Sequence, residues 1–87
     1  MTEESVIEFP CEFPIKMMGR NTPEFRTTAR ALVEKHAGAV RDDAVQESLS
    51  RNDRFVSNTV TITANSQQQL DAIYQDVTDH DDVLMAL

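Results

Sequence analysis

Large apolar residues occupy alternate positions along two segments, a pattern that predicts strands with one buried face. In residues 13–18 they are Phe13, Ile15 and Met17. In residues 55–64 one predicted face carries apolar residues and Asn58, whereas the other carries an unbroken row of hydroxyls. The first set is Val56, Asn58, Val60, Ile62 and Ala64, and the second is Ser57, Thr59, Thr61 and Thr63. This predicts a sheet with one buried and one polar side.

Two other segments repeat apolar residues every three or four positions, which predicts helices with a single buried stripe. The first begins at Thr22-Pro23, because Thr22 can cap free N–H groups and Pro23 has the backbone angle of a first helical residue. Gly38 is typical of a helix end. The second begins after Ser66, which has the capping-box spacing to Gln69. The stripes are Phe25, Ala29, Leu32, Val33 and His36, then Leu70, Ile73, Tyr74 and Val77.

Two short segments are less clear. In residues 42–50, Val45 and Leu49 can both face a core, but strict alternation would place Glu47 beside them. An edge strand with a bulge would avoid this, and a short helix is the alternative that the pattern leaves open. Residues 83–87 are expected to form a last strand, with an apolar face of Val83, Met85 and Leu87.

The predicted order of elements is strand, helix, strand, strand, helix, strand. Two single-striped helices are buried most economically on one face of a shared sheet, and the crossover rule then favours a split β-α-β arrangement. We therefore predict an α+β, ferredoxin-like fold with a four-stranded antiparallel sheet and two helices on one face. Residues 1–12 are expected to form an acidic, flexible N-terminal tail, and residues 13–87 the single domain.

Charge and cysteine content narrow the classes of function. The 87 residues include 15 acidic and eight basic ones, for a net charge of −7, which opposes binding to nucleic acid or to an anionic membrane surface. Cys11 is the one cysteine, so neither an internal disulfide nor a cysteine-based zinc site can form. No segment resembles a membrane span or a signal peptide, and we expect a cytoplasmic protein.

Few residues are candidates for catalysis or for metal binding. His36 belongs to an apolar stripe, and Cys11 has no base near it in the sequence. His80 lies among aspartates, but the spaced ligands and glycine of a calcium loop are missing. We therefore predict a protein without catalytic residues, metal or cofactor.

The loop between the first strand and the first helix is one candidate site. A strand end followed by a helix N-terminus can bind an anionic group, and Arg20 could pair with its charge. The predicted ligand-binding residues are Gly19, Arg20, Asn21 and Thr22. The same loop has fragments of an acylphosphatase-like phosphate site, namely Gly19, Arg20 and Asn58, although it lacks a second glycine.

The polar side of the sheet is the other candidate site. If Met17 faces inward, Met18 must share the outer face with the threonine row, which mixes apolar and hydroxyl groups. Such a face is either an ordinary solvated surface or a surface for a protein partner, including a second copy of the chain. The predicted interaction surface consists of Lys16, Met18, Thr59, Thr61, Thr63 and Leu84.

Several short motifs, in this order and spacing, resemble the YbeD-like family of small bacterial proteins of unassigned function. They are Glu8-Phe9-Pro10, Phe13, Lys16-Met17-Met18-Gly19, Pro23-Glu24, His36-Ala37, Val60-Thr61-Ile62-Thr63, Gln69, Tyr74 and Val83-Leu84-Met85-Ala86-Leu87. The resemblance implies a fold similar to the ACT regulatory domains, which bind amino acids beside metabolic enzymes. It also implies an association with the control of lipoate metabolism.

From these observations we expect a regulatory or adaptor domain that acts through contacts with a partner protein. A small-molecule sensor, with a metabolite bound at the loop between first strand and first helix, is the alternative. An acylphosphatase-like hydrolase is a second and weaker alternative.

Overall fold

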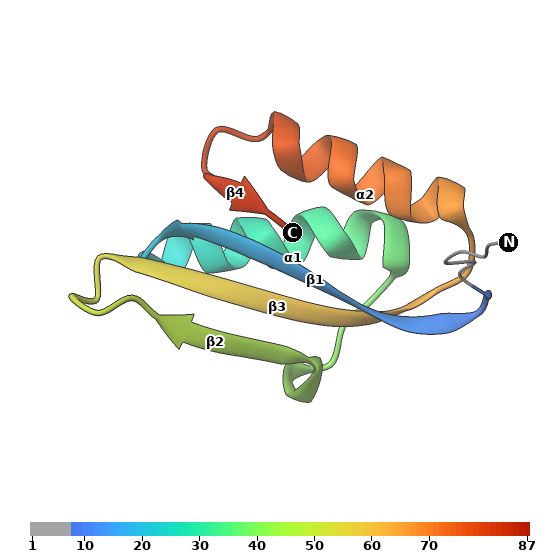
Figure 1. Ribbon diagram of the computed structural model, residues 1–87, viewed down its shortest axis with the longest axis horizontal. Coiled ribbons are helices and arrows are strands. Elements are labelled where there is room, and N and C mark those ends of the chain that lie inside the picture. The colour runs from blue at the N-terminus through green and yellow to red at the C-terminus, as the bar shows by residue number, and fades with distance from the viewer. Residues whose placement is uncertain (1–7) are drawn as a thin grey trace, which may run out of the picture.

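The computed structural model describes residues 8–87 as one antiparallel sheet covered on one face by two helices (Figure 1). The strand order is β2-β3-β1-β4. Together with the order of elements along the chain, this is the predicted ferredoxin-like split β-α-β fold. The elements are β1 (Cys11–Arg20), α1 (Pro23–Ala37), a 3₁₀ turn η1 (Asp42–Ala44), β2 (Val45–Leu49), β3 (Phe55–Ala64), α2 (Gln67–Asp79) and β4 (Met85–Ala86).

Strand β1 is longer than predicted at both ends. Cys11 pairs with Ala64 at its start and Arg20 pairs with Phe55 at its end, so β1 is matched to the full length of β3. Gly19 and Arg20 thus continue the strand beyond the predicted residues 13–18. Of the predicted tail, residues 1–7 lie outside the described residues, whereas Cys11 and Glu12 belong to the sheet.

Both helices begin where their capping residues predict. The Thr22 hydroxyl accepts a hydrogen bond from the Phe25 N–H at 3.0 Å, and the Ser66 hydroxyl accepts one from the Gln69 N–H at 3.0 Å. Gly38 follows α1 with a φ of 81°, a left-handed value that favours glycine. These local hydrogen bonds explain why the helix starts could be read from the sequence.

The core lies between the helices and the inner side of the sheet. The residues on the predicted stripes and inner strand faces are buried there, including Ile15 and Met17 of β1 and Leu70 and Ile73 of α2. Most of the apolar surface that stabilises the domain is thus on one side of the sheet. The face opposite the helices contributes little to this core.

Strand β2 keeps strict alternation, without the predicted bulge. It pairs residue by residue with β3, from Val45 opposite Val60 to Leu49 opposite Val56. The alternative of a short helix is limited to the single turn of η1. Glu47 does lie on the inner side, and it is accommodated because Arg26 of α1 forms an ion pair with it at 2.6 Å.

Strand β4 faces the opposite way from the prediction. Met85 lies opposite Met18, and Ala86 lies opposite the buried Met17. Val83 is buried in the preceding turn, where its N–H donates to the His80 carbonyl, so the alternation restarts one residue later. Met85 therefore takes the place on the outer face that we predicted for Leu84.

Candidate functional site: the outer face of the sheet

The side of the sheet opposite the helices is not covered by any element of residues 8–87 (Figure 1). We call it the outer face. From the register, its side chains alternate with those of the core along β1, β2 and β3. They include Lys16, Met18 and Arg20 of β1, Gln46 and Ser48 of β2, Phe55, Ser57, Thr59, Thr61 and Thr63 of β3, and Met85 of β4.

A shallow hollow of about 290 Å³ opens on this face beside the turn between β2 and β3. Its apolar side chains on the outer face are Met18 and Phe55, and the lining also includes Leu49, an edge residue that the register places on the inner side of the sheet. Three serines and Lys16 complete the lining, together with Val56. The hollow can thus take an apolar side chain while offering hydroxyl groups at its rim.

Exposed apolar groups continue from the hollow to the end of the chain. Met85 is 53% exposed and Leu87 is 65% exposed. The Leu87 N–H donates to the Lys16 carbonyl at 2.9 Å, and the Leu87 carbonyl accepts from the Tyr74 hydroxyl at 2.7 Å. These bonds fix the last residue against β1, so its exposure is not that of a frayed end.

The structure brings together most of the predicted interaction surface. Lys16 and Met18 of β1 lie beside the hydroxyl row of the neighbouring strand β3, on the same face. In this row Thr59 and Thr61 are half-buried and Thr63 is exposed. Leu84 is not part of this group. Sequence reasoning missed Phe55, Arg20, Met85 and the hollow, and alternation extended to the full length of β1 and β3 would have identified the first two.

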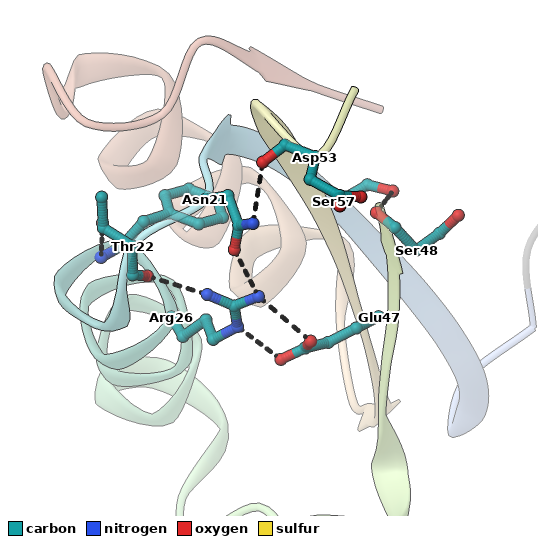
Figure 2. A network of polar contacts seen from close by, with 8 residues as sticks. Asn21, Thr22, Arg26, Glu47, Ser48, Asp53 and Ser57 are labelled. Carbon is teal, nitrogen blue, oxygen red and sulfur yellow. Dashed lines mark hydrogen bonds and ion pairs between the residues drawn. The ribbon is translucent and has the colours of Figure 1, made fainter. Parts of the chain in front are cut away.

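The predicted anion-binding loop is occupied by contacts within the protein (Figure 2). The Arg26 guanidinium donates to the Thr22 carbonyl at 3.1 Å, to the Asn21 side-chain oxygen at 2.8 Å and to Glu47. The Asn21 amide donates in turn to the Asp53 carbonyl at 2.8 Å. These bonds join α1, β2 and the turn before β3.

The four residues predicted for this loop do not converge on one site. Gly19 is buried against the ring of Phe25, whereas Arg20 lies on the outer face with its guanidinium 5.9 Å from the centre of the Phe55 ring. Asn58 is on the inner side of β3, away from Arg20, so the fragments of an acylphosphatase-like site are not assembled.

A second polar cluster joins the two helices. The His36 ring nitrogen Nε2 lies 2.7 Å from Asp76, and the Lys35 ammonium lies 3.1 Å from the same carboxylate oxygen. The hydrogen bond to His36 and the contact with Lys35 lower the pKa of Asp76 below its ordinary value of 3.8. Because the contacts link α1 to α2 across the top of the core, we assign this cluster a structural role.

The Asp76→Asn variant is expected to lose stability at neutral pH and to lose less of it in acid. A carboxyl with a lowered pKa in the folded state contributes stability above its ordinary pKa, and this contribution disappears as the pH falls. Urea unfolding of the wild type and the variant should therefore give a difference that shrinks on acidification. A difference that is constant with pH would contradict this role for the carboxylate.

Comparison with known proteins defines the family. The family described as "Protein of unknown function (DUF493)" matches residues 4–87. The chain belongs to the DUF493 family. Among similar proteins, UPF0250 protein NE1487 of Nitrosomonas europaea is 44% identical over 87 residues, which are 100% of both chains. A UPF0250 protein of Chromobacterium violaceum is 44% identical over 85 residues, 98% of this chain and 96% of the relative.

The fold is found in a solved structure as well. The solution structure of protein HP0495 from H. pylori matches with a TM-score of 0.78 and covers 99% of this chain and 90% of the other. The identity is 20%, so this likeness concerns the fold alone. The family identification confirms the resemblance to small bacterial proteins of unassigned function that the motifs predicted.

The description of the DUF493 family names no activity, so function has to be argued from the surface of the molecule. Within residues 8–87, neither helix has the length and apolar character needed to cross a bilayer. The same part of the chain holds no group of three His, Cys, Asp or Glu side chains placed to bind a metal ion. The outer face is the most distinctive feature of this surface.

Proposed function

We infer that this DUF493 protein is a non-catalytic adaptor that binds a partner protein through the outer face of its sheet. The observation that carries the proposal is the row of apolar groups on this face. It runs from the hollow at Met18 and Phe55 to the exposed Met85 and Leu87. A row of this kind, rimmed by hydroxyls, is typical of an interaction surface rather than of an ordinary solvated sheet.

A protein partner suits this face better than a small molecule. The hollow is open to solvent and shallow, whereas most small-molecule sites enclose their ligand. The alternative loop site is less suitable, because the Asn21 and Thr22 groups that would bind an anion already have partners in the protein. The resemblance to regulatory ACT domains supports a metabolic enzyme as the partner, with lipoate metabolism as the pathway that the family resemblance suggests.

The double variant Met18→Asp/Met85→Asp tests this proposal. Two buried carboxylates would oppose any contact with an apolar partner surface, so the partner should be lost. The matched control is Ala31→Asp/Gln68→Asp, which adds the same charge at exposed positions on the helices. The measurement is affinity capture from native cell extract with chemical crosslinking, comparing wild type and both variants after their folding has been checked by thermal unfolding.

If the proposal is correct, the wild type and the control variant both capture the same partner protein from the extract, and it crosslinks to Lys16. The outer-face variant should not capture this protein. Equal retention by all three proteins would contradict the proposal. Light scattering of the purified protein addresses a second copy as the occupant. A dimer that dissociates in the outer-face variant and not in the control would replace the adaptor proposal with self-association.

A further inference from the structure

The basic residues divide into two groups of equal size. Of the eight in the chain, four form ion pairs, each with at least one carboxylate within 4 Å: Arg26, Arg30, Lys35 and Arg41. Within residues 8–87 the other four have no such carboxylate: Lys16, Arg20, Arg51 and Arg54. In a protein with a net charge of −7, basic side chains that lack an acidic neighbour are candidates for binding the acidic groups of another molecule.

We call these four residues the basic end: Arg20, Arg51 and Arg54 lie at one end of the sheet, and Lys16 lies nearer the middle of β1, opposite Thr59. Lys16 and Arg20 lie on the outer face of β1, four residues and therefore about 14 Å apart. Arg51 and Arg54 belong to residues 50–54, the turn that joins β2 to β3 (Figure 1). Because Arg20 pairs with Phe55 in the register, the turn and the end of β1 are neighbours.

The hollow of the outer face lies at the basic end. Lys16 is the one charged residue in its lining, whereas two hollows near the opposite end of the sheet both include Glu12, one together with Arg41 and the other with Asp43. Asp53 belongs to the turn, and the backbone carbonyl of Asp82 lies behind Gly19. Neither aspartate forms an ion pair with the four cations at a distance of 4 Å or less.

The turn that carries Arg51 and Arg54 is held by a dense set of hydrogen bonds. The Ser50 N–H donates to the Phe55 carbonyl at 2.9 Å, and the Phe55 N–H donates to the Ser50 hydroxyl at 3.0 Å. The Asn21 side-chain amide donates to the Asp53 carbonyl (Figure 2). The Asn21 backbone N–H donates to the Arg54 carbonyl, so both bonds fix the turn to the residues just before α1. A turn that is already ordered loses little backbone conformational entropy when a partner binds, so binding at Arg51 and Arg54 costs less free energy.

We propose that the basic end binds an acidic segment of the partner protein, with an apolar side chain of that segment in the hollow between Met18 and Phe55. This inference rests on the proposed adaptor function and specifies the chemistry of its partner. Arg20 lies against Phe55, which restricts its motion and leaves its planar N–H groups able to bind a carboxylate. Lys16 at the rim of the hollow supplies a second contact for a carboxylate.

An acidic protein segment fits this surface better than nucleic acid does. Binding to a phosphate backbone depends on many cations along a path, and the net charge of −7 repels a polyanion at long range. A protein segment carries fewer charges, and the ions of physiological solution screen the rest of the molecule beyond about 8 Å. The hollow also provides an apolar contact that a phosphate backbone would not use.

Fluorescence anisotropy with a labelled peptide, Glu-Glu-Leu-Phe-Glu-Glu, tests the inference. The comparison peptide has glutamine in place of every glutamate, and a single-stranded oligonucleotide tests nucleic acid. The variant Arg20→Gln/Arg54→Gln removes two cations of the basic end. Its matched control, Lys35→Gln/Arg41→Gln, removes two cations elsewhere and changes the net charge equally.

We expect saturable binding of the acidic peptide that weakens with added salt and falls about tenfold or more in the Arg20/Arg54 variant, with little change in the control. Equal binding of the two peptides, equal losses in the two variants, or tighter binding of the oligonucleotide would overturn the inference. So would a dimer that depends on Arg20 and Arg54. If these tests fail while capture still depends on Met18 and Met85, the adaptor proposal stands and only the acidic partner is wrong.

Discussion

Replacing Gly19 with valine is expected to destabilise the protein strongly. Gly19 is buried at the end of β1, where a Cβ atom would lie 2.3 Å from the Phe25 ring and 2.7 Å from the Asp82 carbonyl oxygen. Phe25 is fully buried under the first turn of α1, and the carbonyl belongs to the backbone, so neither can move aside easily. Overpacking of this kind costs about 3 kcal/mol or more, a large part of the roughly 5–15 kcal/mol that stabilises a small domain.

Urea unfolding of Gly19→Ala, Gly19→Val and Gly38→Ala measures the effect. Gly38 is a suitable control because its φ of 81° would strain any other residue, whereas the space around it is empty. Combining each alanine variant with Phe25→Leu separates the two causes. A smaller side chain at position 25 should reduce the cost of Gly19→Ala, but not the cost of Gly38→Ala. Additive effects in both pairs would contradict the close contact between Gly19 and Phe25.

Elements defined by neighbouring residues could be predicted from the sequence. Thr22 and Ser66 each bond to an N–H three residues ahead, so the signals for both helix starts lie within a few positions. The length of β3 followed from its alternation over residues 55–64. Strand order then followed from the general preference for right-handed crossovers, which needs no information about particular contacts.

Features set by distant contacts could not be predicted. The inward position of Glu47 in β2 depends on Arg26, which is 21 residues away in α1, and without this partner a bulge was the reasonable expectation. The orientation of β4 depends on the turn at His80, which buries Val83 and shifts the alternation by one residue. The threonine row of the candidate site was predicted, whereas its apolar neighbour Met85 depended on that shift.

The charges of the candidate site illustrate the same limit. The sequence shows eight basic residues, but not which of them have acidic partners. Arg26 in the first turn of α1 and Arg30 near its middle are both paired. Arg20, only three positions before α1, lies on the other side of the sheet without an ion-paired carboxylate. The basic end can be identified only after the ion pairs have been assigned, because a net charge of −7 gives no sign of a local group of unpaired cations.

Replacing Asn58 is expected to change stability in opposite directions, depending on the new side chain. Asn58 lies on the inner side of β3 and is 3% exposed. Its Oδ1 is the one buried side-chain oxygen or nitrogen of residues 8–87 without a hydrogen-bond partner. Since an unsatisfied buried polar group costs about 1–3 kcal/mol, Asn58→Val should be more stable than the wild type by about 1 kcal/mol.

Asn58→Asp should instead lose several kcal/mol at neutral pH, because it buries a carboxylate directly opposite Glu47 on the same side of the sheet. Burial raises the pKa of such a carboxyl, so the loss of stability is fully present above that raised pKa. The loss decreases as the pH falls and the group becomes neutral.

Urea unfolding of wild type and both variants, at neutral pH and near the ordinary pKa of aspartate, measures these differences in stability. The difference from the wild type shrinks in acid for both Asn58→Asp and Asp76→Asn, but for opposite reasons. In Asn58→Asp a destabilising charge of the variant is neutralised, whereas in Asp76→Asn the wild type loses a stabilising charge. Equal stability of Asn58→Asp and wild type at neutral pH would mean that solvent reaches the inner side of β3 beneath α1.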